Sequence, residues 1–288
     1  MTETEGIEFC FEAIIGDVVR SSAEYAKSHE NTDDYINPEN GLIYCGKCHT
    51  PKQCVIKHLR TGRDMTVNCI CKCDADTAKE KTKKHEEERL AKIKENCKMP
   101  GIFWNADFSE IEDEKKRKNA VNYFRNFDSI GSSGLLLYGN VGTGKSFMAA
   151  CIANALINEK HSVRWLHAAQ IVEMSGFFNE NEYETYLSSI SRPDLLIIDD
   201  LGCERGTDYA IERVHTLIDY RISIGKPMIV TTNLELSEMQ GTTDLRRERT
   251  YDRIFKSCFP IGFHGKSYRQ KQARENFAKM NELLNEKI

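Results

Sequence analysis

The segment GNVGTGKS, residues 139–146, constrains the fold more than any other feature of this sequence. It fits the pattern G-x-x-x-x-G-K-[ST], and it lies between an apolar run at 135–138 and a helical pattern at 147–160. Glycines in such a turn let successive backbone N–H groups face one phosphate, and the N-terminus of the following helix faces the same charge. The sequence therefore predicts a strand–loop–helix phosphate site. Its candidate nucleotide-binding residues are Gly139, Asn140, Val141, Gly142, Thr143, Gly144, Lys145, Ser146 and Phe147.

A second motif, LLIIDD at 195–200, predicts the metal and water ligands of that site. Its four apolar residues indicate a buried strand, and carboxylates at the carboxyl end of such a strand reach the ligand crevice of an α/β sheet. We expect Lys145 to reach the β- and γ-phosphates of ATP, and Ser146 and Asp199 to hold Mg²⁺. Asp200 would orient or deprotonate the attacking water.

Two further polar residues are candidates for the same site. Asn233 ends the apolar run PMIVTTN, residues 227–233, where a polar side chain can contact the γ-phosphate or the attacking water. Glu204 lies four residues after Asp200 and is the alternative carboxylate for hydrolysis. The catalytic candidates from the chain itself are therefore Asp200 and Asn233, with Glu204 kept open.

Apolar strands that alternate with helical stretches define the fold class. The predicted strands are 135–139, 162–167, 195–200, 227–233 and 258–263. This pattern predicts an α/β fold with a doubly wound, mostly parallel sheet of five strands. Composition shifts divide the chain into a helical segment at 1–40, a Cys-rich domain at 41–74, a charged linker helix at 75–99 and an ATPase domain at 100–288.

Composition excludes several classes of protein. The 288 residues carry a net charge of −4, which argues against a generic basic coat for nucleic acid. Residues 245–274 nevertheless hold nine Lys and Arg against two acidic residues, so a local anion-binding site is expected there. No apolar run approaches the roughly 18 residues of a membrane span, and no secretory signal is visible. We therefore expect a cytoplasmic protein with no membrane partner.

Cysteines cluster near the N-terminus. Six of the eleven cysteines lie between Cys45 and Cys73, and in a reducing compartment such a cluster indicates metal ligands rather than disulfides. A Cys-x-x-Cys pair followed by a Cys-x-Cys-x-Cys run suits a tetrahedral Zn²⁺ ion with a structural role. Four of five candidates would bind it: Cys45, Cys48, Cys69, Cys71 and Cys73.

Together, several motifs resemble those of one family. GNVGTGKS, LLIIDDLG, the helix ending in LIDYRISIGKPMIVTTN, RRERTYDRI and GKSYR are similar in order and spacing to motifs of the DnaC/IstB-like AAA+ ATPases, which include helicase loaders and transposition helpers. The resemblance covers about residues 100–275. The Cys-rich piece and the charged helix after it are similar to the zinc-bearing helicase-binding domains of some loaders. The resemblance implies an ATPase that uses ATP, Mg²⁺ and a structural Zn²⁺.

The resemblance also implies partners and further site residues. Loaders of this type form homo-oligomers in the ATP state, with ATP held between neighbours. Arg253 matches the arginine that one subunit supplies to the next, with Arg249 as the alternative. Arg269 matches a position that contacts phosphate within the same subunit. Single-stranded DNA would contact residues near 170–182.

Three functions remain open from the sequence. The first is a loader that grips a hexameric replicative helicase through its zinc domain and places it on single-stranded DNA, with slow hydrolysis stimulated by assembly or DNA. The second is an IstB-like transposition helper that acts on duplex DNA with a transposase. The third is a nucleotide-dependent adaptor with little hydrolysis, which is kept open because Asp200 stands where AAA+ proteins usually have Glu.

Overall fold

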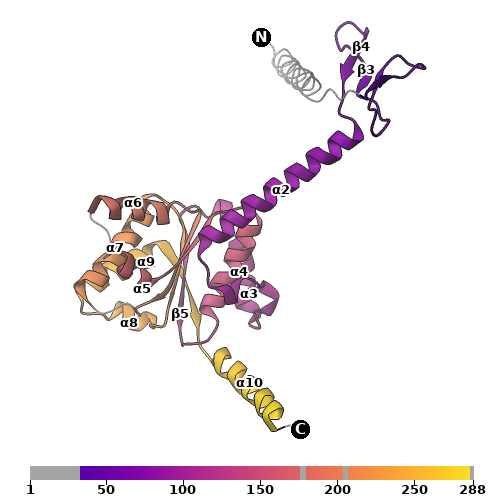
Figure 1. Cartoon of the computed structure of the whole chain (residues 1–288). Coiled ribbons are helices and arrows are strands. Elements are labelled where there is room, and N and C mark those ends of the chain that lie inside the picture. Colours follow the sequence, from indigo (N-terminus) through magenta and orange to yellow (C-terminus); the bar gives the residue numbers. More distant parts are fainter. Residues whose placement is uncertain (1–32, 176–179, 204–206, 286–288) are drawn as a thin grey trace. The chain divides into compact units, whose positions relative to one another are not determined.

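A computed structural model of the chain describes residues 33–175, 180–203 and 207–285 (Figure 1). The predicted helical segment at 1–40 falls largely outside these residues, and Glu204 falls outside them completely. The chain divides into two compact units, Met1–Glu88 and Arg89–Ile288. Within the described part, no helix is long and apolar enough to cross a membrane.

The first unit contains short antiparallel strands around the cysteine cluster. β1 (Tyr35–Ile36) pairs with β2 (Ile43–Tyr44), and β3 (Gln53–Lys57) pairs with β4 (Asp64–Asn68) as a hairpin. The helix α2 (Lys72–Cys97) begins within the second group of cysteines, so that Cys73 lies in its first turn, and the boundary between the units falls inside this helix. These small sheets bury few side chains, so this unit lacks a large apolar core.

The second unit is built on a five-stranded sheet whose neighbouring strands are all parallel. Each strand agrees with a predicted one to within a residue, and the three central strands β7, β8 and β5 are short, largely buried apolar runs. The prediction of an α/β fold with five strands is therefore confirmed. In spatial order the strands are β6 (Val163–His167), β7 (Leu195–Leu201), β8 (Met228–Thr232), β5 (Gly134–Gly139) and β9 (Cys258–Phe263).

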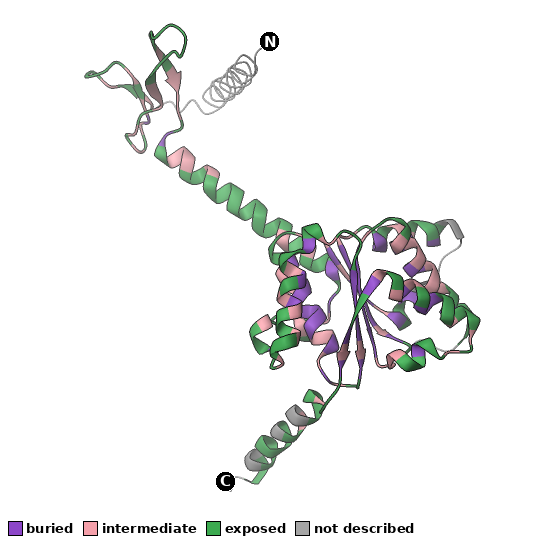
Figure 2. Cartoon of the chain, turned by 180° about the vertical axis from the view of Figure 1, so that it is seen from behind, coloured by how far each residue is buried: buried purple, intermediate pink, exposed green. Residues whose placement is uncertain are grey.

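Helices cover both faces of this sheet, and alternate residues of each strand pack into two separate cores (Figure 2). Leu135 and Leu137 of β5 face one core, whereas Leu136 faces the other. The first core includes α3 (Glu114–Arg125) and α4 (Lys145–Asn158). The second includes α5 (Ala168–Ser175), α6 (Glu180–Ser191), α7 (Asp208–Ser223) and α9 (Leu245–Ser257).

The remaining elements are short, apart from the last helix. They are the 3₁₀ turns η1 (Gly101–Phe103), η2 (Phe108–Glu110) and η3 (Phe127–Ser129), and the helices α8 (Leu236–Gln240) and α10 (Tyr268–Asn285). β5 leads into the phosphate loop and lies between β8 and β9 in the sheet. The loops that follow β5 and β8 are therefore neighbours. A crevice at the carboxyl ends of the strands is expected at such a point.

Arg221 holds the starts of two neighbouring strands, β7 and β8, in place. Its side chain is fully buried, and its guanidinium donates hydrogen bonds to the carbonyl oxygens of Ser191, Pro193, Asp194 and Pro227. Burial lowers the pKa of Arg221 to about 10, which leaves it charged at neutral pH. These carbonyls come just before β7 and β8. Arg221 therefore holds the starts of the two strands whose other ends carry the candidate site.

Candidate functional site

The phosphate loop joins the end of β5 to the start of α4, as the sequence predicts. Gly139, Gly142 and Gly144 have positive φ angles of 113°, 75° and 96°. A Cβ on Gly139 would lie 2.6 Å from the carbonyl oxygen of Phe263 on β9, so the packing of the two strands also requires glycine here. The loop therefore has the tight curl that turns backbone N–H groups toward one point.

Lys145 is held inside this loop. Only 5% of the surface of Lys145 is exposed, and its Nζ donates to the carbonyl oxygens of Gly139 (2.8 Å) and Asn140 (2.7 Å). Nζ also donates to Oδ1 of Asn233 at 2.9 Å. Burial lowers the pKa of Lys145, and the carboxylate of Asp200 opposes that shift. The structure thus brings together two residues that lie 88 positions apart in the sequence and belong to separate motifs.

Asp199 is the buried acid of the site, with 2% of its surface exposed. Its Oδ1 accepts hydrogen bonds from the hydroxyls of Ser146 and Thr231, both at 2.7 Å. Burial raises the pKa of Asp199, and these two hydroxyls oppose the rise. A hydroxyl and a carboxylate side by side offer the oxygen ligands that Mg²⁺ prefers. Ser146 and Asp199 therefore fit the metal of a Mg²⁺–nucleotide complex.

Asp200 has an unusual backbone conformation. Its φ angle is 58°, and the pairing of β7 with β8 shifts register between Ile198 and Leu201. The N–H of Asp200 donates to the Thr231 hydroxyl at 2.9 Å, which stabilises this bulge. A non-glycine residue in the left-handed region is strained, and such strain is concentrated at functional sites. Here it allows Asp199 to remain buried while Asp200 lines the cavity.

A cavity of ≈ 350 Å³ opens at the carboxyl ends of β5 and β8. Its lining includes the P-loop, Asp200, Asn233 and Arg269, and also apolar side chains such as Phe263 together with the charged residues Glu110, Glu112, Asp113 and Lys116. Nζ of Lys116 lies 4.6 Å from the centre of the Phe263 ring. A cavity that combines a phosphate loop with apolar and polar side chains suits a nucleotide, which has charged phosphates and a flat base with polar edges.

The three candidate arginines lie at different positions relative to the cavity. Arg269, in the first turn of α10, lines the cavity. Arg253 on α9 does not line it, and its Nε lies 3.1 Å from Oδ1 of Asp219 on α7. Arg249 is exposed on the same helix. Arg269 thus lies at the site of its own chain, whereas Arg253 and Arg249 do not.

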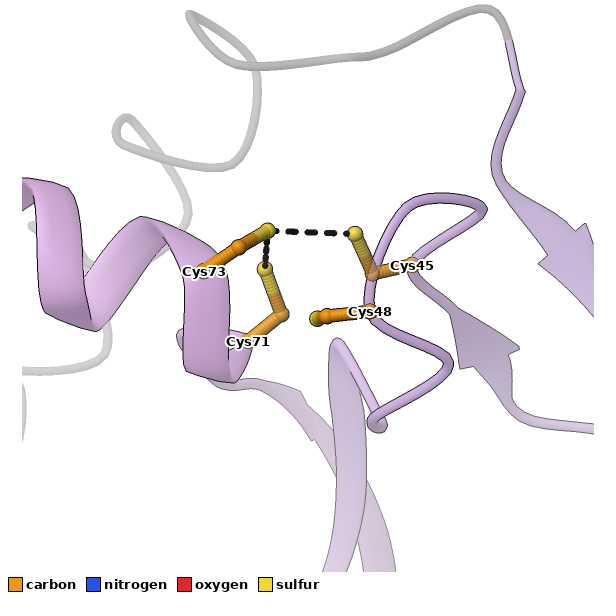
Figure 3. A group of neighbouring side chains, drawn as sticks. All are labelled: Cys45, Cys48, Cys71 and Cys73. Atoms are coloured by element: carbon orange, nitrogen blue, oxygen red, sulfur yellow. Dashed lines mark hydrogen bonds between the residues drawn. The ribbon is translucent and has the colours of Figure 1, made fainter.

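Four cysteines of the first unit converge on one point (Figure 3). The Sγ atoms of Cys45, Cys48, Cys71 and Cys73 all lie within 4.8 Å of one another. The Sγ of Cys73 lies 3.5 Å from that of Cys45 and 3.3 Å from that of Cys71. A tetrahedral zinc with Zn–S bonds of 2.3 Å separates its sulfurs by about 3.8 Å. The donor type and spacing of the quartet therefore fit a structural Zn²⁺ ion.

Polar side chains around the quartet join its two halves. The Thr50 hydroxyl accepts the N–H of Lys72 at 2.9 Å and lies 3.1 Å from Sγ of Cys48. Hydrogen bonds, first of all the one with this hydroxyl, lower the pKa of Cys48 to about 5, whereas burial raises the pKa of Cys71. Nearby, Nζ of Lys52 lies 2.6 Å from Oδ2 of Asp34. Nζ of Lys52 also lies 3.9 Å from Oδ2 of Asp74, so its charge is shared between two carboxylates.

Cys69, the fifth candidate ligand, is placed elsewhere. Its Sγ donates to the carbonyl oxygen of Pro51 at 3.4 Å, and it is not part of the quartet. Burial and the neighbouring thiol of Cys54 raise the pKa of Cys69. The structure thus selects four of the five cysteines that the sequence left open, and it places Cys69 directly after the β3–β4 hairpin.

Three residues of these sites have no assigned role in the sequence analysis. Thr231 connects Asp199 to Asp200, His167 lies beside Asp199, and Thr50 connects the two halves of the cysteine quartet. Thr231 lies in the polar end of a predicted strand, and this position is a weak sequence signal for a role in the site. The other two contacts depend on how separate segments are brought together, which local sequence patterns do not reveal.

Comparisons with known proteins agree with this geometry. The profile of the family described as IstB-like ATP binding protein matches residues 66–276. The "Replicative helicase loader DnaI" of Bacillus subtilis is 22% identical over 264 residues, which cover 84% of this chain and 83% of that protein. The "Replicative helicase loader DnaC" of Escherichia coli is 29% identical over 197 residues, covering 64% of this chain and 79% of that protein. A crystal structure of DnaI matches 59% of this chain and 94% of its own, with a TM-score of 0.48 and 22% identity.

The family match covers well over half of the chain. The chain therefore belongs to the IstB-like ATP-binding family, and it is an AAA+ P-loop protein of the DnaC/IstB type. Membership of an ATP-binding family agrees with the phosphate loop, the buried Lys145 and the Ser146–Asp199 pair described above.

Proposed function

We propose that this chain is an ATP-dependent loader that places a hexameric replicative helicase on single-stranded DNA. One observation carries the proposal: the similarity to the loader DnaI extends into the cysteine-bearing unit. It covers 84% of the chain, or about 242 residues, whereas Arg89–Ile288 contains only 200. A purely ATPase-domain similarity would end near Arg89.

In this proposal the cavity of the second unit binds ATP. Lys145 contacts the β- and γ-phosphates, and Ser146 and Asp199 hold Mg²⁺, which neutralises phosphate charge when bound. The strained backbone of Asp200 aims its carboxylate at the attacking water. The shorter reach of Asp, compared with Glu, favours slow turnover.

Two further residues would sense the γ-phosphate. Asn233 contacts Lys145 in the structure, so a phosphate bound by Lys145 also comes within reach of the Asn233 amide. Arg269 lines the cavity and would contact phosphate within its own subunit. Both side chains stabilise negative charge that develops on the transferred phosphoryl group.

Completion of the site would require a second copy of the chain. Arg253 would leave Asp219 and insert into the cavity of the neighbouring subunit. Both side chains of this ion pair are nearly half exposed (43% and 46%), so breaking it requires little energy. ATP would thereby couple hydrolysis to assembly of the homo-oligomer.

The cysteine-bearing unit would grip the helicase. A Zn²⁺ ion held by the quartet would replace the large apolar core that this unit lacks. Single-stranded DNA would contact the ATPase unit near residues 170–182, of which 176–179 lie outside the described residues.

A second function is supported by the family match itself. The matching profile is named for IstB-like proteins and starts at residue 66, so it requires only part of the cysteine-bearing unit. In this alternative the chain assists a transposase on duplex DNA. The two functions share one ATPase site and differ in their partner and in the form of DNA.

Helicase loading can be tested with a closed circular single-stranded template that carries an annealed oligonucleotide. A closed helicase ring threads onto linear DNA from a free end, whereas a circle offers no end. We expect this chain, with ATP and Mg²⁺, to increase oligonucleotide displacement by the hexameric helicase of the same genome on the circle and much less on a linear template.

The control is the Lys145→Ala variant, which removes the ammonium from the phosphate loop and should give no stimulation on the circle. Equal stimulation by Lys145→Ala would refute a nucleotide-driven loader. No stimulation by the native chain, together with ATP-dependent assembly on duplex DNA, would favour the transposition helper. Assembly without any turnover above the Lys145→Ala level would indicate an adaptor.

A further inference from the structure

We propose that His167 is a positioning residue for the Mg²⁺ site, acting through Asp199. This inference rests on the proposed ATPase function, and it concerns a residue with no motif of its own. His167 is the last residue of β6, and it pairs in register with Asp199 of the neighbouring parallel strand β7. The register therefore places an imidazole beside the buried carboxylate at the carboxyl edge of the sheet.

The two oxygens of Asp199 have different surroundings. Oδ1 accepts from the hydroxyls of Ser146 and Thr231, so one side of the carboxylate is fixed. Oδ2 lies 3.4 Å from Nδ1 of His167. This distance is longer than the usual range of about 2.7–3.2 Å for an N–H···O hydrogen bond, and a closing shift of a few tenths of an ångström would let an imidazole with its proton on Nδ1 donate to this oxygen. His167 would thus fix the remaining rotation of the carboxylate.

His167 is well placed for support rather than for chemistry. Like Asp199 itself, it is not among the residues that line the cavity, whereas Asp200 is. Its own backbone is held locally, because its N–H donates to Oε1 of Gln170 at 3.2 Å. Outer partners of this kind orient metal-binding carboxylates, and their loss typically weakens metal affinity about 10–100-fold.

The test compares variants that separate hydrogen bonding from packing. His167→Asn keeps an N–H donor near the position of Nδ1, His167→Gln moves the donor toward the position of Nε2, and His167→Leu removes it. The matched control is His161→Leu, which changes a histidine near the opposite end of β6 that faces Asp128 (3.7 Å). Binding of a fluorescent ADP analogue is measured in EDTA and during a Mg²⁺ titration, and ATP hydrolysis is followed over the same titration.

We expect His167→Leu and His167→Gln to raise the half-saturating Mg²⁺ concentration about tenfold or more, with nucleotide affinity in EDTA unchanged. His167→Asn and His161→Leu should stay within twofold of the native chain. A native Mg²⁺ requirement in His167→Leu and His167→Gln would overturn the inference, as would an equal defect in His167→Asn. Absence of nucleotide binding by the native chain would overturn the proposed function as well, so the two failures are distinguishable.

Discussion

Replacing Thr231 by valine removes one hydroxyl from the nucleotide site and keeps the branched shape of the side chain. That hydroxyl donates to Asp199 at 2.7 Å and accepts from the N–H of Asp200 at 2.9 Å. A hydrogen bond to a charged group contributes about 1.5–3 kcal/mol, and a buried donor without a partner costs about 1–3 kcal/mol. Because both effects involve one hydroxyl and are not additive, we expect Thr231→Val to lower the free energy of unfolding by about 2–4 kcal/mol.

The stability that Thr231→Val loses should depend on pH. The ionisation of Asp199 decides whether this loss grows or shrinks as the pH rises. Burial raises the pKa of Asp199, and the Ser146 and Thr231 hydroxyls oppose that rise, so Thr231→Val raises the pKa further. A carboxyl whose pKa is raised in the folded state stabilises the fold only at low pH. Its contribution is lost as the pH rises above the unfolded value of about 3.9 and through the folded pKa. The difference in stability between variant and native chain should therefore be larger at pH 8 than at pH 5.

Urea unfolding of the full chain at both pH values measures this difference. Thr231→Ser, which keeps the hydroxyl, should lose far less stability than Thr231→Val. The matched control is Thr232→Val: the buried Thr232 hydroxyl donates to the carbonyl oxygen of Leu201 at 2.7 Å and accepts from the N–H of Leu234 at 3.2 Å, and the loss of these neutral hydrogen bonds, about 1–3 kcal/mol, should be the same at either pH. Equal losses in Thr231→Val and Thr232→Val at both pH values would refute the role assigned to Thr231.

Further predictions concern the metal, the strand anchor and the second copy. Cys73→Ser should lose zinc, whereas Cys69→Ser should keep about one zinc per chain by elemental analysis; zinc loss in Cys69→Ser alone would contradict the quartet. Arg221→Met should lower the free energy of unfolding by about 3–5 kcal/mol, because several buried carbonyls lose their donor, and a change below 1 kcal/mol would contradict this anchor. Arg253→Ala and Asp200→Asn chains should be inactive alone and regain hydrolysis when mixed; failure to complement would move the trans-acting arginine to Arg249.

The sequence predicted the ATPase fold well because its signals are local. The central strands of the sheet are largely buried apolar runs, and the phosphate loop is a contiguous motif. The approach of Lys145 to Asn233 could also be expected, since both follow strands whose carboxyl ends meet at one edge. The left-handed backbone of Asp200 could not, because it depends on a register shift between β7 and β8.

The remaining contacts depend on three-dimensional arrangement. His167 meets Asp199 only because β6 neighbours β7 in the sheet, and the strand order was not predicted. The choice among the cysteines likewise depends on the β3–β4 hairpin, which carries Cys54 and leads Cys69 away from the quartet. Spacing alone left Cys69, Cys71 and Cys73 equivalent.

The most direct test of the loader proposal is light scattering after gel filtration of the native chain, mixed with the hexameric replicative helicase of the same genome, ATP and Mg²⁺. The loader proposal predicts a complex larger than the helicase hexamer, which is lost when Cys45 and Cys48 are both changed to Ser while the variant still binds nucleotide. Absence of a complex with the native chain, together with ATP-dependent assembly on duplex DNA, would contradict it.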